Sequence, residues 1–153
     1  MFYQRGLPGM RKRYPHDHMV MTGYLNNLGQ SLYLGKKFAE AEQIMTECVP
    51  LLDKNLGEGR NRWKVFRGQV WLGDSLREQE KYDEAEIELI ASYEGLVAQK
   101  EKTTSNYQPY LVLSVESLIK LYQSRGREGD EENVLKWKTI LESAKSELQA
   151  VEN

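Results

Sequence analysis

Three side chains that can bind a metal ion stand together near the start of the chain, in the sequence His16-Asp17-His18. Zinc and nickel accept imidazole and carboxylate ligands, but a structural zinc site has four ligands, which come from more than one segment. The sequence supplies no further histidine and only one cysteine. We therefore expect no metal site and no cofactor, with Asp17 capping a following helix and both histidines in solvent.

Carboxylates are the other side chains that could take part in catalysis, as general acids, general bases or nucleophiles. Nothing in the sequence places two of them in contrasting environments, as an acid–base pair requires. The phosphate-loop pattern G-x-x-x-x-G-K-[ST] and the catalytic patterns H-E-x-x-H, G-x-S-x-G, H-R-D and D-F-G are absent. We predict that the chain is not an enzyme, with no catalytic residue and no small-molecule substrate. We expect solvated positions on helices for Glu40, Glu42, Glu84 and Glu86.

The elements that carry these side chains repeat along the chain. The segment LGQSLYLGKKFAEAE at 28–42 recurs 44 residues later as LGDSLREQEKYDEAE at 72–86. Leu25, Leu28 and Leu32 have the spacing of one face of a helix. A short turn is followed by a second apolar face, made of Phe38, Ala41, Met45 and Cys48. Each copy therefore predicts a hairpin of two helices, which must stack on neighbouring hairpins to bury its apolar faces.

Small residues of the repeat predict how closely its helices pack. Gly29 and Gly73 lie inside the first helix of each copy, where glycine costs about 1 kcal/mol relative to alanine. We therefore expect a neighbouring helix to approach closely at both positions. Cys48 stands where the second copy has Ser92, which predicts a packed side chain rather than a redox thiol. Pro50 lies inside the second predicted helix and predicts a kink or a break there.

The whole pattern predicts an all-α domain over residues 15–150. We expect helices near 17–34, 38–54, 62–79, 82–100, 109–125 and 130–150. They form about three repeats, at 17–60, 61–105 and 106–150. The third repeat is degenerate, with an insertion expected in its turn, and its last helix has a polar face that would cap the stack. A coiled-coil seam is the alternative for that helix. Residues 1–14 predict a basic, flexible arm, or else the remnant of a further repeat.

The pattern L-G-x-S-L followed by [FY]-x-E-A-E resembles the tetratricopeptide repeat (TPR), which has Leu-Gly, an aromatic residue and Ala at these offsets. The period of 44 residues, with the sequence Leu-Asn-Asn-Leu-Gly at 25–29, is similar to the kinesin-light-chain type of TPR. The stretch YDEAEIELIASYEGL and the closing helix with Leu-Lys-Trp at 135–137 also resemble TPR tails of bacterial multidomain proteins, some of them serine/threonine kinases. The resemblance covers about residues 15–142. It implies a solenoid of stacked hairpins; HEAT repeats share the period but lack this pattern.

The resemblance implies a concave groove, lined by the first helix of each hairpin, in which TPR proteins bind peptides. We therefore expect a scaffold for an unidentified peptide or protein segment. In TPR proteins an asparagine at the place of Asn27 commonly bonds the backbone of an extended peptide. The second and third repeats have Trp71 and Ser117 there, so the clamp by which some TPR cochaperones hold a C-terminal carboxylate is not reproduced. The expected groove residues are Asn26, Asn27, Gln30, Tyr33, Arg67, Trp71, Asp74, Ser117 and Lys120.

We expect Trp71 to contribute most to binding, because large aromatic side chains dominate many interfaces. The alternative is that Trp71 packs beneath a long helix or beneath the N-terminal arm.

Composition limits the other functions. The 153 residues carry a net charge of -2, which argues against a nucleic-acid-binding or acidic disordered protein as a whole. No apolar run approaches the roughly 18 residues of a membrane span. With no signal-peptide pattern and one cysteine, we expect a cytoplasmic protein that binds no membrane. Two alternatives stay open: a regulatory or self-association tail related to a bacterial kinase, and, less expected, nucleic-acid binding through Arg5, Arg11, Lys12 and Arg13.

Overall fold

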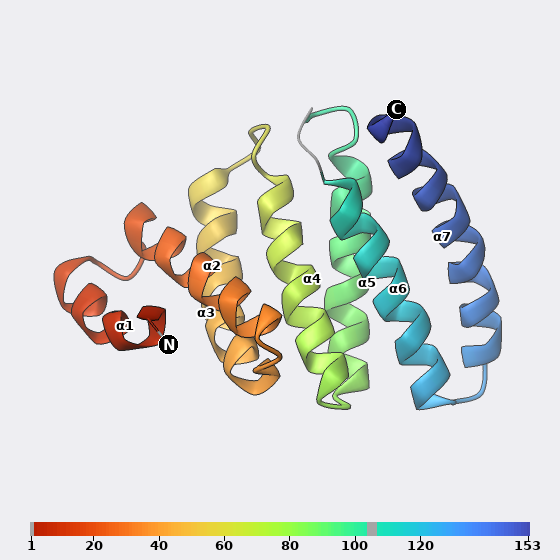
Figure 1. Cartoon of the computed structure of the whole chain (residues 1–153), viewed down its shortest axis with the longest axis horizontal. Helices are drawn as coiled ribbons and strands as arrows, with labels where there is room; N and C mark the ends of the chain where they lie inside the picture. The colour runs from red at the N-terminus through yellow and green to blue at the C-terminus, as the bar shows by residue number, and fades with distance from the viewer. Residues whose placement is uncertain (1, 104–106) are drawn as a thin grey trace.

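The computed structural model describes residues 2–103 and 107–153, and these residues form α-helices with no β-strand among them (Figure 1). The helices are α1 (Phe2–Arg13), α2 (Met19–Leu34), α3 (Phe38–Leu56), α4 (Trp63–Glu78), α5 (Tyr82–Ala98), α6 (Gln108–Arg125) and α7 (Asp130–Glu152). The predicted all-α class is confirmed. The ends of α2 to α7 lie within two residues of the six predicted helices.

From α2 to α7, successive helices run in opposite directions and lie side by side along the molecule (Figure 1). The turns α2–α3, α4–α5 and α6–α7 lie at one end of the helices, and the linker between α3 and α4 lies at the other. Helix α4 packs against α2 and α6 in addition to its chain neighbours α3 and α5. Helices α2, α4 and α6 therefore form one layer, which we call the even layer, and α3, α5 and α7 form the odd layer.

The first two hairpins repeat at the level of the backbone. Lys36 and Glu80, 44 residues apart, are the described residues other than glycine with a positive φ, at 57° and 62°. In each turn the amide of the next lysine donates to the carbonyl five residues before it, over 2.9 Å and 3.0 Å. This pairing satisfies a carbonyl at the end of α2 and of α4.

The predicted close approach at the two helix glycines is confirmed. A Cβ atom on Gly73 would lie 2.7 Å from Cγ of Leu89 and 3.2 Å from its backbone nitrogen. A Cβ atom on Gly29 would overlap the sulfur of Met45, which stands 44 residues before Leu89. Each glycine therefore lets the second helix of its own hairpin pack directly against the first.

The third hairpin differs in its spacing. Gly126, with φ 61°, follows the last residue of α6 and stands 46 residues after Glu80, the residue with positive φ in the α4–α5 turn. The first residue of α7 stands 48 residues after the first residue of α5. The α6–α7 turn, residues 126–129, is one residue longer than the turns at 35–37 and 79–81, and Gly129, with φ 87°, lies within it. The predicted insertion in this turn is confirmed, and Trp137 packs in the core at the position that Leu89 occupies in the second hairpin.

The N-terminal segment differs from the flexible arm that the sequence predicted, because residues 2–13 form α1. Leu7, Met10 and Tyr14 pack against the core. The Arg11 guanidinium donates to both carboxylate oxygens of Glu47 on α3, over 2.9 Å and 2.7 Å. Two glycines and a proline inside α1 lower its intrinsic helix propensity. Its stability therefore depends on these tertiary contacts.

Pro50 does not break α3, which continues to Leu56. Pro50 is exposed, as is Thr46, whose carbonyl lacks the usual partner four residues later. Water can bond that carbonyl, so the helix continues without a buried unpaired group.

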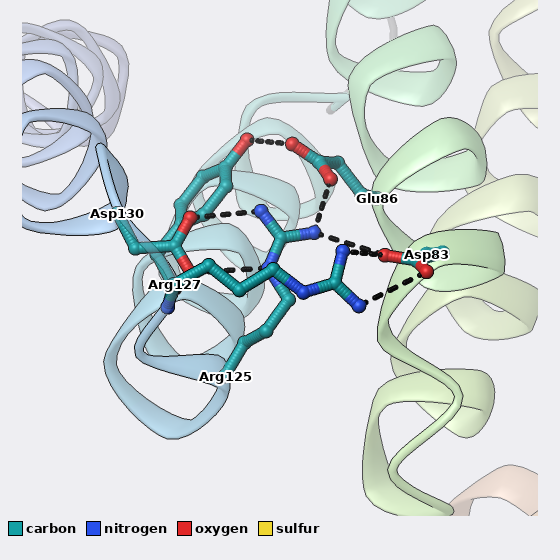
Figure 2. A network of polar contacts seen from close by, with 6 residues as sticks. Asp83, Glu86, Arg125, Arg127 and Asp130 are labelled. Atoms are coloured by element: carbon teal, nitrogen blue, oxygen red, sulfur yellow. Dashed lines mark hydrogen bonds and ion pairs between the residues drawn. The ribbon is translucent and has the colours of Figure 1, made fainter.

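Ion pairs join the third hairpin to the second (Figure 2). Arg125, at the end of α6, has a side chain only 9% exposed. It donates to both oxygens of Asp130 on α7, over 3.1 Å and 2.8 Å, and to Glu86 on α5, over 2.5 Å. The Tyr122 hydroxyl donates to the other oxygen of Glu86 over 2.7 Å. Arg125 thus fastens α5, α6 and α7 at a single point.

A corresponding joint lies between the second hairpin and the first. Glu42 stands 44 residues before Glu86 and accepts hydrogen bonds from Gln79 over 2.7 Å and from Lys81 over 3.0 Å and 2.7 Å. The pKa of Glu42 is lowered by its hydrogen bonds to Lys81 and Gln79, which outweigh the opposing effect of burial. The repeat in the sequence therefore includes the polar contact between hairpins as well as the apolar faces.

Acid is expected to weaken the α6–α7 joint. The Arg125 hydrogen bonds, helped by the Arg127 amide, lower the pKa of Asp130 from 3.8 to about 2, against the effect of desolvation. A carboxyl with a lowered pKa contributes stability above its unfolded pKa and loses it as the pH falls through the folded value. We expect the urea midpoint to decrease from pH 4 towards pH 2 more steeply in the wild type than in Asp130→Asn. The exposed neighbour Glu131→Gln should keep the wild-type slope; equal slopes in all three proteins would contradict this assignment.

Candidate functional site on the even layer

The nine predicted groove residues all lie on the helices of the even layer. Four come from α2, three from α4 and two from α6: Asn26, Asn27, Gln30, Tyr33, Arg67, Trp71, Asp74, Ser117 and Lys120. The contacts of α4 with α2 and α6 bring these helices together. The structure separates the nine residues into a buried base and a set of side chains without partners.

Trp71 is not available at the surface, so the prediction of an exposed aromatic side chain was wrong. It is 3% exposed and packs in the core. The ring of Tyr33 lies 6.4 Å away on one side and that of Tyr110 lies 6.1 Å away on the other. The Arg67 guanidinium lies over the indole, 4.8 Å from its centre. Tyr33 of α2, Tyr110 of α6 and Arg67 therefore surround the Trp71 indole.

Arg67 is enclosed by aromatic rings from two helices. Besides Trp71, its guanidinium lies 5.1 Å from the centre of Trp63 on α4 and 5.7 Å from that of Tyr110 on α6. Its Nε and the indole Nε1 of Trp63 are buried and have no hydrogen-bond partner in residues 2–103 and 107–153. The guanidinium has no ion pair with any described residue. We call Arg67 and these three rings the Arg67 cluster.

A second polar cluster joins all three even helices and is internally satisfied. Asp74, 6% exposed, accepts from Tyr33 of α2 over 2.8 Å, from Arg77 over 2.9 Å and from Ser117 of α6. Burial and the Asp74 charge raise the pKa of the Tyr33 hydroxyl, which stays protonated as a donor. Tyr33, Asp74 and Ser117 therefore hold the helices in register, and they leave no carboxylate for Arg67.

The remaining predicted residues do not pair with other side chains in the described part of the chain. Asn27 and Lys120 are exposed, and Asn26 and Gln30 are partly buried. Within the described ranges, none of these four side chains has a hydrogen bond or an ion pair. The Oδ1 atom of Asn26 is buried without a partner. With Arg67, they form a set of amide and cationic groups on the helices of the even layer, which we call the recognition set.

Charge is divided unequally between the two layers. Helices α3, α5 and α7 carry 15 acidic and four basic residues, a net charge of -11. Helices α2, α4 and α6 carry three acidic and five basic residues, a net charge of +2, and α2 has no charged residue at all. The even layer is thus the side of the hairpin array that favours an anionic ligand.

Cys48 and the segment His16-Asp17-His18 are the other residues whose side chains could do chemistry. Burial raises the pKa of the Cys48 thiol to about 12, which agrees with the predicted packing role. His18 rather than Asp17 caps α2, since its Nδ1 accepts from the Val20 amide over 3.1 Å. Asp17 instead pairs with Lys54 over 2.6 Å. Within the described ranges, no three His, Cys, Asp or Glu side chains gather as metal ligands.

A hollow of about 730 Å³ beside the α6–α7 turn is lined by Tyr122, Arg127, Asp130 and Leu135, among others. Three of its polar side chains, Tyr122, Arg127 and Asp130, pair with Glu86, Asp83 and Arg125 respectively. The hollow therefore belongs to the joint between hairpins.

In the described part of the chain no helix is both long and apolar enough to span a membrane.

No protein-family model, no curated protein and no solved structure matches this chain. The assignment of a function therefore depends on the geometry of the even layer.

Proposed function

We propose that the chain is a non-enzymatic scaffold that binds an extended peptide or protein segment along the even layer. The observation that carries the proposal is the recognition set: amide and cationic side chains lie on the three helices of one layer and lack partners within the described residues. Buried polar groups normally find partners. An extended peptide presents both backbone donors and backbone acceptors, which suit the asparagine and glutamine side chains.

The base beneath the recognition set favours tight binding. Trp71, Tyr33, Asp74 and Ser117 hold α2, α4 and α6 against each other through ring contacts and hydrogen bonds. Such a preformed surface loses little conformational entropy when a ligand binds. In this view Trp71 supports the binding surface from below and does not contact the ligand.

We further propose that the hairpins form a solenoid of the TPR type with α7 as its cap. Three observations support this proposal: the 44-residue repeat, the contacts between successive even helices, and the mainly polar exposed side of α7. In such a solenoid the first helix of each hairpin lines the concave side. The recognition set would then face a groove that follows the length of the array.

The test of peptide binding begins with selection from a random-peptide phage library on the wild-type protein. We expect Asn27→Ala/Gln30→Ala to bind a selected peptide about 30-fold more weakly, because two hydrogen bonds worth about 1 kcal/mol each are lost. Fluorescence polarisation with the labelled peptide gives the affinity. The matched control, Gln43→Ala/Gln149→Ala, removes exposed amides from α3 and α7 and should bind like the wild type. Equal affinity of both double variants would refute binding at the even layer.

A further inference from the structure

The Arg67 cluster contains two polar groups that the fold itself leaves unsatisfied. Arg67 contacts three rings, and Trp63, only 8% exposed, has an indole N–H without a partner. A cation over aromatic faces is stabilised by their quadrupoles, but this attraction uses none of its N–H donors. The guanidinium is therefore held in place with its Nε buried, and its two Nη groups form no hydrogen bond or ion pair with any described residue.

The carboxylate nearest along the same helix face does not neutralise Arg67. Asp74 is already shared among Tyr33, Arg77 and Ser117, and Glu78 pairs with Arg77 over 2.7 Å. The other acidic residue of the even layer, Glu116, pairs with Lys145 on α7 over 3.4 Å. Every acidic residue of the even layer thus has a partner other than Arg67.

We propose that Arg67 binds the carboxylate of an Asp or Glu side chain in the peptide, an inference that rests on the proposed function of the even layer. A guanidinium matches a carboxylate in a planar, two-bond geometry. The even layer, with a net charge of +2 beside an odd layer of -11, favours an acidic segment over a basic one. A phosphate carries nearly two charges and is usually held by several arginines, whereas Arg67 is the single cation of its cluster.

The experiment uses the peptides selected on the wild-type protein. We expect an Asp or Glu at one fixed position in most of them. A labelled peptide with Glu at that position and its Gln counterpart are then measured against wild type and Arg67→Gln, which completes a double-mutant cycle. In the wild type, Glu→Gln should weaken binding about 10- to 100-fold, the range for a hydrogen-bonded charge pair. In Arg67→Gln the two peptides should bind alike.

Two further proteins separate this charge pair from general effects. Arg60→Gln removes one exposed positive charge from the α3–α4 linker and should keep the full preference for the Glu peptide. Arg67→Lys keeps the charge but not the planar fork, so it should retain only part of the preference. Circular dichroism melting checks that each variant is folded. Should Arg67→Gln fail to fold, the Arg67 Nε–H resonance of the wild type gives the answer, since only the Glu peptide should shift it.

The possible results distinguish the inference that Arg67 binds a carboxylate from the proposal that the even layer binds a peptide. Selected peptides without an acidic position, or an undiminished Glu preference in Arg67→Gln, would overturn the carboxylate inference and leave peptide binding intact. A phosphoserine peptide that binds far more tightly than the Glu peptide, through Arg67, would replace carboxylate by phosphate and also overturn it. Failure to select any peptide on the wild type would contradict the proposed function, and with it this inference.

Discussion

Replacement of Arg125 by methionine is expected to destabilise the protein by about 3–5 kcal/mol, the usual cost of removing one member of a buried ion pair. Methionine fills the space of the side chain stem but leaves Asp130, 3% exposed, and Glu86 without their cation. The Asp130 carboxylate then remains buried without a cation, whereas that of Glu86 is 27% exposed and can be hydrated in part. Urea denaturation followed by far-ultraviolet circular dichroism gives the change in the free energy of unfolding.

Arg127→Met is the matched control, because Arg127 pairs with Asp83 at the rim of the same network (Figure 2). Their side chains are 57% and 66% exposed, and exposed ion pairs contribute less than about 1 kcal/mol. The double variant Arg125→Met/Asp130→Asn should recover part of the lost stability, since one uncompensated charge is gone. If Arg125→Met and Arg127→Met cost the same, the joint does not depend on the buried arginine.

Gly73→Ala is expected to destabilise the protein by about 1–3 kcal/mol, the range for overpacked cores. Alanine is the better helix former by about 1 kcal/mol, so the expected loss arises entirely from packing. The added methyl would lie 2.7 Å from Cγ of Leu89 and 3.2 Å from its backbone nitrogen. The leucine side chain can rotate, but its backbone moves only if α5 moves away from α4.

Gly23→Ala on α2 separates the two effects. Nothing lies within 4 Å of a Cβ atom built on Gly23, so only the helix propensity changes. This variant should gain about 0.5–1 kcal/mol. The free energies of unfolding of the two variants should therefore change in opposite directions in the same urea assay, and a gain in both would show that α5 tolerates a larger residue at Gly73.

Helix positions and the repeat could be predicted from the sequence because both depend on local information. Leucine spacing defines the apolar faces, and two glycines 44 residues apart mark the close contacts. Helix α1 was missed, although Leu7, Met10 and Tyr14 have helical spacing. The glycines and the proline between them suggested a flexible arm. The contact of Arg11 with Glu47, 36 residues later, cannot be read from local pattern.

The sequence was sufficient to predict which helices carry the candidate site. It was not sufficient to predict which of the side chains are buried and which lack partners. Whether Trp71 is exposed depends on Tyr110, a residue of another hairpin, and on the direction of the Arg67 side chain. Likewise, Asp74 is a structural residue because Tyr33 and Ser117 reach it from two other helices. The helical period of a sequence shows which residues share a face of a helix. Whether a polar side chain has a hydrogen-bond partner depends on residues that are distant in the sequence.

The polar joint between hairpins has a consequence for how such a chain can change length. Glu42 and Glu86 accept from the next hairpin at equivalent places, so the second hairpin presents to its successor the carboxylate that the first presents to it. A duplicated second hairpin would find a compatible neighbour on either side. Extension by whole units would thus require no new interface chemistry, and each added unit would lengthen the ligand-facing side by one further helix.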